Sequence, residues 1–235
     1  MSKAQETVLE INLNSLTHNY TFLRSRLSPG IKFMGVVKAF AYGSDSVEIS
    51  KKLEEIGVDY LAIAYAEEGV TLRNSGIMLP ILVLHSQMVS FHTIIDRCLE
   101  PAMYSKRILR EFIETAEKCG QKNYPVHLKF NTGLNRLGFN ESEVTEVLQI
   151  LKKTDAIKVA SIFSHLAASE DLNEREFTLN QIASFSKIAS EVEKGLSYKP
   201  FKHLANTSGI LNYPEAHFDM VRSGIGLYGF GNETQ

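Results

Sequence analysis

A lysine and a tyrosine lie four positions apart, directly after a short apolar segment of the sequence. Residues 33–37 are mostly apolar and predict a buried strand, and Lys38 and Tyr42 follow it. Desolvation at the end of a buried strand disfavours the charged form of a lysine and lowers its pKa. An uncharged lysine amine forms Schiff bases with carbonyl compounds, which makes Lys38 a candidate for covalent catalysis. A lysine whose stem lies on apolar surface while its ammonium reaches water fits the same position, so both interpretations stay open here.

Polar and charged side chains also follow later apolar segments of the chain. Each of them alone has a structural explanation as a surface arginine, a buried histidine or a glycine that a turn requires. Lys129 interrupts an apolar segment and needs a partner there, which a structural ion pair would supply. The residues that follow these segments, in chain order, are Arg136, His165, Asn206, Thr207, Arg222, Gly224 and Ile225.

The segments that must position these residues alternate between strand and helix patterns. Such alternation implies parallel pairing with right-handed crossovers. Eight units favour a closed (β/α)8 barrel over an open doubly wound sheet, and the carboxyl ends of the strands of such a barrel surround one active-site mouth. The predicted strands are residues 33–38, 60–64, 81–84, 100–103, 126–131, 157–164, 201–205 and 218–221. The predicted helices are residues 14–27, 45–57, 66–74, 89–97, 105–120, 140–151 and 174–194.

The first residues of the chain have a different pattern. Residues 9–13 alternate apolar and polar side chains, which predicts a half-buried strand. Because this strand precedes the first barrel unit, we assign residues 1–13 to a separate N-terminal segment and residues 14–235 to the barrel.

The composition is that of a soluble globular protein with a sizeable core. Of the 235 residues, 44% are hydrophobic and 22% are charged, and the formal net charge is −2. This balance gives no reason to expect nucleic acid or an anionic membrane surface as a partner. We find no apolar run long enough to span a bilayer, no signal-peptide pattern and no zinc-ligand cluster, so no metal is expected. Cys98 and Cys119 form no CxxC pair, which favours reduced thiols and a cytoplasmic location.

Brought to one mouth, the candidate residues meet the needs of a phosphorylated aldehyde cofactor. The amides of residues 223–225 and the hydroxyls of Tyr42 and Thr207 suit a phosphate, which (β/α)8 barrels bind near their last strands. Lys38 suits an imine with the aldehyde, and Arg222 suits a ring heteroatom. Pyridoxal 5′-phosphate has all three groups, and its ring acts as an electron sink. The sequence therefore predicts pyridoxal 5′-phosphate as the cofactor.

Five segments together resemble the alanine racemase family, in the family's order and spacing and over nearly the whole chain. They read Lys-Ala-Phe-Ala-Tyr-Gly at 38–43, Lys-Phe-Asn-Thr-Gly-Leu-Asn-Arg-Leu-Gly at 129–138, Ser-His at 164–165, His-Leu-Ala-Asn-Thr-Ser at 203–208 and Val-Arg-Ser-Gly-Ile-Gly-Leu-Tyr-Gly at 221–229. The resemblance implies a TIM-like barrel of the fold-type III pyridoxal phosphate enzymes. It also implies an isomerase that interconverts L-alanine and D-alanine and supplies D-alanine for cell-wall peptidoglycan.

The resemblance implies roles for individual residues. Lys38 would carry the cofactor and act as the catalytic base on one face of the substrate Cα. Arg136 would bind the substrate carboxylate, for which a guanidinium fork is suited, and Lys129 matches a position that is carbamylated in many family members. Arg222 would lie against the pyridine nitrogen, and His165 would pack on the cofactor ring and hydrogen-bond toward Arg222. The implied cofactor-binding residues are Lys38, Tyr42, His165, Asn206, Thr207, Arg222, Gly224 and Ile225.

Members of the family carry a second, mostly β domain after the barrel, and the 235 residues end just past the last barrel turn. In the family that domain packs with the N-terminal strand and supplies a catalytic tyrosine across a homodimer interface. Racemisation needs a base on each face of the substrate. We therefore expect this chain to bind the cofactor but to have little or no racemase activity by itself.

The sequence departs from the family pattern at Phe40, at Ser44-Asp45 and at Asn131, where an aspartate is usual. An alternative is a non-catalytic, single-domain protein of pyridoxal phosphate homeostasis, which has about this length but different lysine and arginine motifs. The Arg136 motif favours the racemases over that class. Fold-related decarboxylases place other residues after the lysine. The segment at 38–43 also resembles the racemase part of fused enzymes that carry a D-alanyl-adding ligase upstream.

Overall fold

Eight parallel strands close into a barrel within the described residues, 7–196 and 198–231, of the computed structural model. Each strand pairs with the next one along the chain, and β8 pairs with β1 to close the barrel. The predicted (β/α)8 barrel is therefore confirmed, and each predicted strand is present with its ends shifted by at most two residues. The strands are β1 Lys32–Val36, β2 Tyr60–Ile63, β3 Ile81–Val83, β4 Glu100–Met103, β5 Tyr124–Lys129, β6 Ile157–Phe163, β7 Phe201–His203 and β8 Met220–Ser223.

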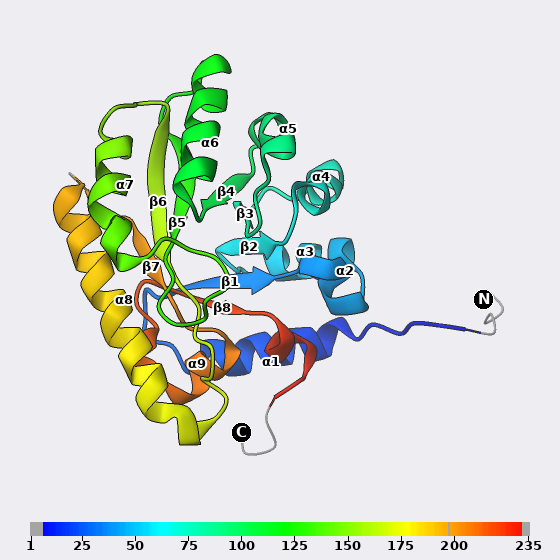
Figure 1. Cartoon of the computed structure of the whole chain (residues 1–235). Helices are drawn as coiled ribbons and strands as arrows, with labels where there is room; N and C mark the ends of the chain where they lie inside the picture. Colours follow the sequence, from blue (N-terminus) through cyan, green and yellow to red (C-terminus); the bar gives the residue numbers. More distant parts are fainter. Residues whose placement is uncertain (1–6, 197, 232–235) are drawn as a thin grey trace.

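Helices cover the outside of the barrel (Figure 1). Polar caps begin several of them: the Asp45 carboxylate accepts hydrogen bonds from the amides of Val47 and Glu48, and the Ser105 hydroxyl accepts one from the amide of Ile108. The longer helices are α1 Leu13–Arg24, α3 Ser46–Glu55, α4 Ala66–Asn74, α6 Lys106–Lys118, α7 Val144–Leu151 and α8 Arg175–Gly195. The short segments are α2 Lys38–Gly43, α5 Phe91–Asp96, α9 Thr207–Asn212, η1 Met88–Ser90, η2 Glu141–Glu143, η3 Leu172–Glu174, η4 Pro214–Ala216 and η5 Ile225–Tyr228.

The strand expected at residues 9–13 is not formed. Residues 8–12 are extended without ladder partners, and α1 already begins at Leu13. The Asn12 side chain caps that helix by accepting hydrogen bonds from the amides of Asn14 and Ser15. Alternating side chains favour a strand only where another strand offers a ladder, and the described residues offer none beside this segment.

Side chains of successive strand residues enter two separate apolar layers. Phe33 belongs to the large layer between strands and helices, whereas Met34 belongs to a small cluster inside the barrel. The other buried members of the inner cluster are Val36, Ala62, Leu82, Ala102, Phe163 and Met220. The inner cluster leaves room for polar side chains, among them the buried His127, Ser161 and His203.

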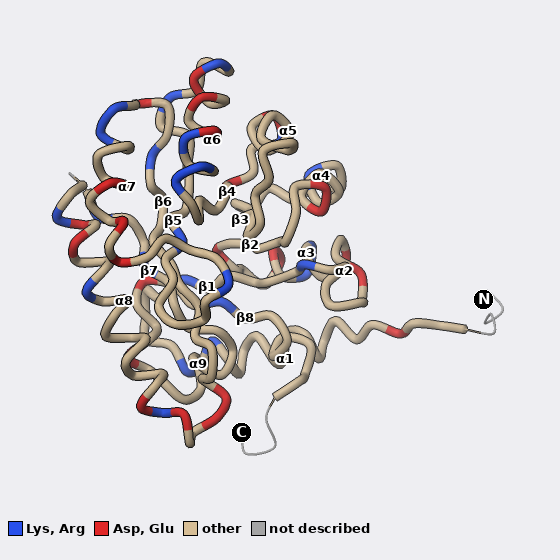
Figure 2. Tube along the Cα trace, viewed as in Figure 1, with Lys and Arg blue, Asp and Glu red and all other residues tan. Residues whose placement is uncertain are grey.

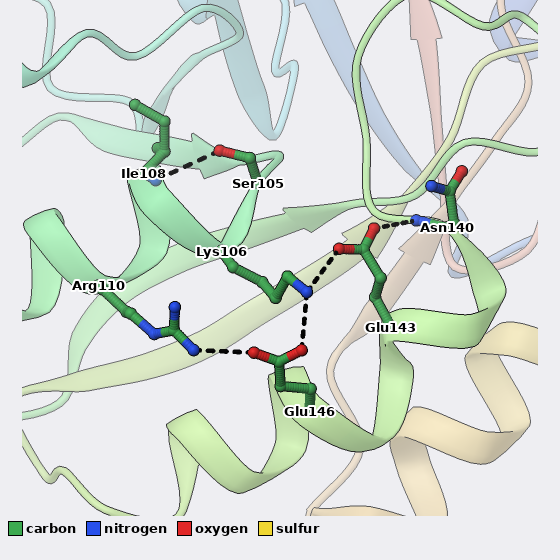
Figure 3. Close-up of polar contacts among 7 residues, drawn as sticks. All are labelled: Ser105, Lys106, Ile108, Arg110, Asn140, Glu143 and Glu146. Atoms are coloured by element: carbon green, nitrogen blue, oxygen red, sulfur yellow. Dashed lines mark hydrogen bonds and ion pairs between the residues drawn. The ribbon is translucent and has the colours of Figure 1, made fainter.

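Acidic and basic residues are interspersed along the outer helices (Figure 2). One cluster joins α6 to α7 (Figure 3): Lys106 Nζ lies 3.2 Å from Glu143 Oε1 and 2.7 Å from Glu146 Oε2, and Arg110 Nη2 lies 2.8 Å from Glu146 Oε1. The other Glu143 oxygen accepts a hydrogen bond from the Asn140 amide at 2.9 Å and caps η2. No helix in the described part of the chain has the length and apolar character needed to cross a bilayer.

Candidate active site

Lys38 lies just beyond the carboxyl end of β1 and opens α2. The next four residues, Ala39 to Tyr42, have φ between 52° and 56°, so α2 is a left-handed turn. A left-handed conformation costs an L-residue about 1–2 kcal/mol, so this turn depends on support from its surroundings. The turn brings the Tyr42 hydroxyl against the backbone of Gly224, beyond the end of β8.

The carboxylate of Glu68, in the first turn of α4, supports the left-handed turn. Its Oε1 accepts a hydrogen bond from the Ala39 amide at 2.6 Å. Its Oε2 accepts hydrogen bonds from the amides of Ala64 at 2.6 Å and Tyr65 at 3.1 Å, which follow β2. One charged side chain therefore joins the ends of β1 and β2, and each hydrogen bond to a charged group contributes about 1.5–3 kcal/mol. Sequence reasoning missed Glu68 because its partners are backbone amides, which no residue pattern identifies.

The carboxyl ends of the strands surround a cavity of about 800 Å³. Every residue that the sequence predicts for the site lines this cavity. They are Lys38, Tyr42, Lys129, Arg136, His165, Asn206, Thr207, Arg222, Gly224 and Ile225. The structure thus brings together side chains that are as far as 187 positions apart, as the strand-end rule for parallel barrels requires.

Part of the cavity wall was not predicted. Tyr65, Leu84 and His85 follow β2 and β3 and line the cavity. The His85 ring stacks on Tyr104 with centroids 5.7 Å apart, and Tyr65 meets the edge of His85 at 5.4 Å. The strand-end rule places these residues at the mouth, but they are part of no extended polar motif that marks them in the sequence.

The cavity collects positive charge. Within the described residues, Lys38, Lys129 and Arg222 form no ion pair with an aspartate or glutamate. Burial, followed by the charges of Arg136, Arg222 and Lys38 in that order, lowers the pKa of Lys129 from 10.5 to about 8. Unpaired cations in a partly desolvated pocket favour anionic ligands such as phosphate or carboxylate.

Arg222 is held by several hydrogen bonds inside the barrel. Its Nη1 donates to His203 Nδ1 at 2.7 Å, and its Nη2 lies 2.7 Å from Ser164 O, 3.1 Å from Leu204 O and 3.2 Å from His165 Nδ1. Burial lowers the pKa of Arg222 to about 9. Burial, followed by the charge of Arg222, lowers the pKa of His165 to about 3, so this histidine is neutral at physiological pH.

Two glycines shape the corner between the ends of β7 and β8. A Cβ on Gly224 would lie 2.2 Å from the Tyr42 hydroxyl oxygen, and a Cβ on Gly226 would lie 2.2 Å from Thr207 Cγ2. The Thr207 hydroxyl lies 3.0 Å from the Ser223 hydroxyl. Hydroxyls and backbone amides therefore share a corner that has no room for a side chain at 224 or 226, and such concavities bind phosphate.

Asn131 organises the loop that carries Arg136. Its Oδ1 accepts hydrogen bonds from the amides of Gly133 at 3.2 Å and Asn135 at 2.9 Å, and its Nδ2 donates to Asn135 Oδ1 at 2.8 Å. An amide oxygen accepts these two backbone hydrogen bonds as a carboxylate would. The departure from the usual aspartate therefore leaves the turn intact and removes one negative charge beside the cavity.

Similarity to known proteins points to the same family. The model of a family described as "Alanine racemase, N-terminal domain" matches residues 11–231. The chain belongs to this family. The alanine racemase of Thermodesulfovibrio yellowstonii is 38% identical over 227 residues, which are 95% of this chain and 60% of that protein. The chain thus spans 60% of the length of this curated relative.

Solved alanine racemases share the barrel. The enzyme of Clostridium difficile 630, in a complex with cycloserine, superposes with a TM-score of 0.88 at 34% identity, over 93% of this chain and 60% of that chain. The alanine racemase of Bartonella henselae with covalently bound pyridoxal phosphate has a TM-score of 0.83 at 24% identity, over 93% of this chain and 62% of that one. At that identity the second likeness establishes the fold alone.

Proposed function

We propose that this chain is the cofactor-binding barrel of an alanine racemase, which interconverts L-alanine and D-alanine with pyridoxal 5′-phosphate. The observation that carries the proposal is the convergence of Lys38, Arg136 and Arg222 on one cavity in a member of the alanine racemase family. The residues present fit the cofactor, because unpaired cations and a side-chain-free corner suit a phosphorylated ligand. When bound, the cofactor withdraws electrons from the amino acid and makes its Cα proton acidic.

Lys38 performs two tasks in this proposal. Its Nζ provides the covalent anchor for the cofactor aldehyde, and it holds the proton removed from one face of the substrate Cα. The strained turn after Lys38 and the hydrogen bond from Ala39 to Glu68 fix the start of the side chain. A fixed base loses little orientational freedom when it reaches the reacting atom.

The corner between β7 and β8 would hold the phosphate. The hydroxyls of Tyr42 and Thr207 and the amides of Gly224 and Ile225 would be its donors. Asn206 positions this corner, because its Oδ1 accepts hydrogen bonds from the Gly209 amide at 2.8 Å and from the Ser169 hydroxyl at 2.7 Å.

Arg222 and His165 would hold the ring of a bound cofactor. A permanent cation beside the pyridine nitrogen would disfavour its protonation and weaken the electron sink. His165 would support the ring as a neutral group, since its pKa is about 3. The electronic state of the cofactor is therefore independent of His165 titration at physiological pH.

Arg136 binds the substrate carboxylate, and Lys129 supports it. A lysine with a pKa of about 8 is uncharged in about a tenth of the molecules at pH 7, and the uncharged amine forms a carbamate with carbon dioxide and releases one proton. The carbamate would replace a cation beside Arg136 with an anion. This charge reversal would relieve the repulsion that lowers the pKa of Lys129.

The second base is proposed to come from outside the barrel, as the family resemblance implies. Homodimer formation would bring it to the face of the substrate that is opposite Lys38. The barrel alone would then bind the cofactor and have little or no racemase activity. A cytoplasmic role in supplying D-alanine for peptidoglycan belongs to the same proposal.

Titration with pyridoxal 5′-phosphate tests this function. The 235-residue chain should acquire the visible absorbance of a cofactor bonded to a lysine, and Lys38→Ala should abolish it. Lys153→Ala, which removes an exposed lysine beyond α7, is the matched control and should leave the absorbance unchanged. Persistence of the band in Lys38→Ala, or its absence from the unmodified chain, would refute the role of Lys38. Rapid alanine racemisation by the chain alone would refute the need for a second base from outside the barrel.

A further inference from the structure

A row of polar side chains runs through the barrel interior from Arg222 to Glu100. His203 Nδ1 lies 2.7 Å from Arg222 Nη1, and His203 Nε2 lies 2.8 Å from the Ser161 hydroxyl. The same hydroxyl lies 2.6 Å from His127 Nδ1, and His127 Nε2 lies 2.8 Å from Glu100 Oε2. These residues come from five adjacent strands, β4 to β8. Glu100 is the first residue of β4, so the row leads away from the mouth toward the amino end of the barrel.

The guanidinium at one end of the row sets the direction in which the hydrogen bonds are donated. A guanidinium has no acceptor, so His203 Nδ1 must accept from Arg222. Burial, followed by the charge of Arg222, holds the pKa of His203 well below its usual value, so the neutral ring carries its proton on Nε2. Nε2 then donates to the Ser161 hydroxyl.

The remaining two hydrogen bonds follow from the first two. The Ser161 hydroxyl accepts from His203, and the only other hydrogen-bond partner of this hydroxyl among the described residues is His127 Nδ1. A buried hydroxyl proton without an acceptor is costly, so this proton is directed to His127 Nδ1. A ring that accepts at Nδ1 carries its proton on Nε2, which donates to Glu100. Each group thus donates once toward Glu100, from a permanent cation at one end to a carboxylate at the other.

The surroundings hold both rings in this arrangement. The His203 ring stacks on Phe163 with centroids 4.8 Å apart and planes 4° apart. The edge of Tyr60 meets His127 at 6.1 Å, and the Tyr60 hydroxyl is hydrogen-bonded to Glu100. His127 and His203 are 1% and 0% exposed, which leaves water little access to replace a lost partner.

We propose that Glu100 is a positioning residue for Arg222, because the carboxylate fixes the proton positions of His127 and His203 and thereby the acceptor that holds the guanidinium. Buried polar groups are costly unless every one of them has a partner, and here all partners are present only in this one direction. The inference rests on the proposed function only in its last step, in which Arg222 faces the ring of a bound cofactor.

Nitrogen-15 NMR of the histidine rings tests the row without any cofactor. In the histidine-labelled chain, His127 and His203 should both carry a proton on Nε2 and a bare Nδ1. The two rings are recognised by their contacts with Tyr60 and Phe163. A proton on Nδ1 of either ring, or a doubly protonated ring, would overturn the proposal.

Two serine variants distinguish the loss of a hydrogen bond in the row from a general loss of packing in the core. Ser161→Ala should remove the acceptor of His203 Nε2–H and make this proton exchange with water at least about tenfold faster, equivalent to about 1.4 kcal/mol. Ser50→Ala is the matched control, because Ser50 is fully buried and its hydroxyl has no partner among the described residues. Equal exchange rates in the two variants would contradict the proposal.

Two variants at the carboxylate test its role directly. Glu100→Gln keeps an oxygen that accepts from His127 and should preserve both proton positions, whereas Glu100→Leu should allow the Nδ1–H form of His127. Unchanged rings in Glu100→Leu would overturn the positioning role. A cofactor titration keeps the two proposals distinct. If the histidine rings carry their protons as proposed but no Lys38-dependent absorbance appears, only the proposed function is refuted. If the absorbance appears but the rings carry their protons elsewhere, only the proposed role of Glu100 is refuted.

Discussion

Two groups of basic side chains, one at the mouth of the barrel and one on its outer helices, have opposite surroundings. Lys129 is 6% exposed and faces other cations, and its pKa falls to about 8. Lys106 lies on α6 near the surface, and hydrogen bonds to Glu146 and Glu143 raise its pKa (Figure 3). The outer group has carboxylates within ion-pair distance, whereas no carboxylate of the described residues forms an ion pair with Lys129.

The difference indicates what each group contributes. Paired surface charges add little to stability, and they add it without a ligand. Buried charges without partners reduce stability and are retained where a ligand or a reaction uses them. The comparison therefore assigns Lys106 to the fold and Lys129 to the site, and the same substitution at both positions tests it.

The largest expected effect is a gain of stability in Lys129→Met. A pKa lowered from 10.5 to about 8 corresponds to a penalty of about 3 kcal/mol for the charged form, at about 1.4 kcal/mol per unit. The penalty is complete below pH 8, and it disappears as the pH rises toward 10.5, because the folded lysine loses its proton before the unfolded one. Urea unfolding in carbonate-free buffer should show a gain of about 2–3 kcal/mol at pH 7 that shrinks at pH 10. A loss of stability at pH 7 would contradict the comparison.

A smaller effect of opposite sign is expected for Glu68→Gln. The amide keeps one acceptor oxygen, so it cannot serve Ala39 on one side and Ala64 and Tyr65 on the other. We expect a loss of about 2 kcal/mol in unfolding free energy and faster hydrogen exchange at the Ala39 amide. Glu67→Gln, an exposed change in the same turn of α4, is the control. Equal unfolding curves for the two variants would show that the left-handed turn does not need Glu68.

The smallest effect is expected for Lys106→Met. The variant loses partly exposed ion pairs with Glu143 and Glu146, so its unfolding midpoint should fall slightly at low salt. Screening should remove the difference at high salt. A loss as large as the gain in Lys129→Met, or one that is insensitive to salt, would mean that the surface cluster is more than a solvated pair.

The position of the site could be predicted because parallel strands force their carboxyl ends together. His165 and Arg222 are 57 residues apart in the chain, yet Arg222 Nη2 lies 3.2 Å from His165 Nδ1. The strand pattern alone predicts that they share a mouth, and motif resemblance suggests which side chains matter. Their roles stay predictions until cofactor binding is measured.

Other features depend on three-dimensional contacts that no local pattern contains. The left-handed turn at Ala39 to Tyr42 runs against residue propensity and is held by Glu68, a residue that the helical pattern treats as an ordinary first-turn acid. The row from Arg222 to Glu100 joins five strands, and nothing in the strand pattern singles out His127. The strand expected at residues 9–13 was wrong for the opposite reason, since a local pattern existed without a partner strand.

The central claim is that Lys38 is the residue that binds the cofactor covalently. Reduction of the chain with borohydride in the presence of pyridoxal 5′-phosphate, followed by peptide mapping, tests it most directly. The account predicts one dominant adduct, on Lys38, that is lost in Lys38→Ala and kept in Lys153→Ala. A dominant adduct on Lys129 or on a surface lysine would contradict it.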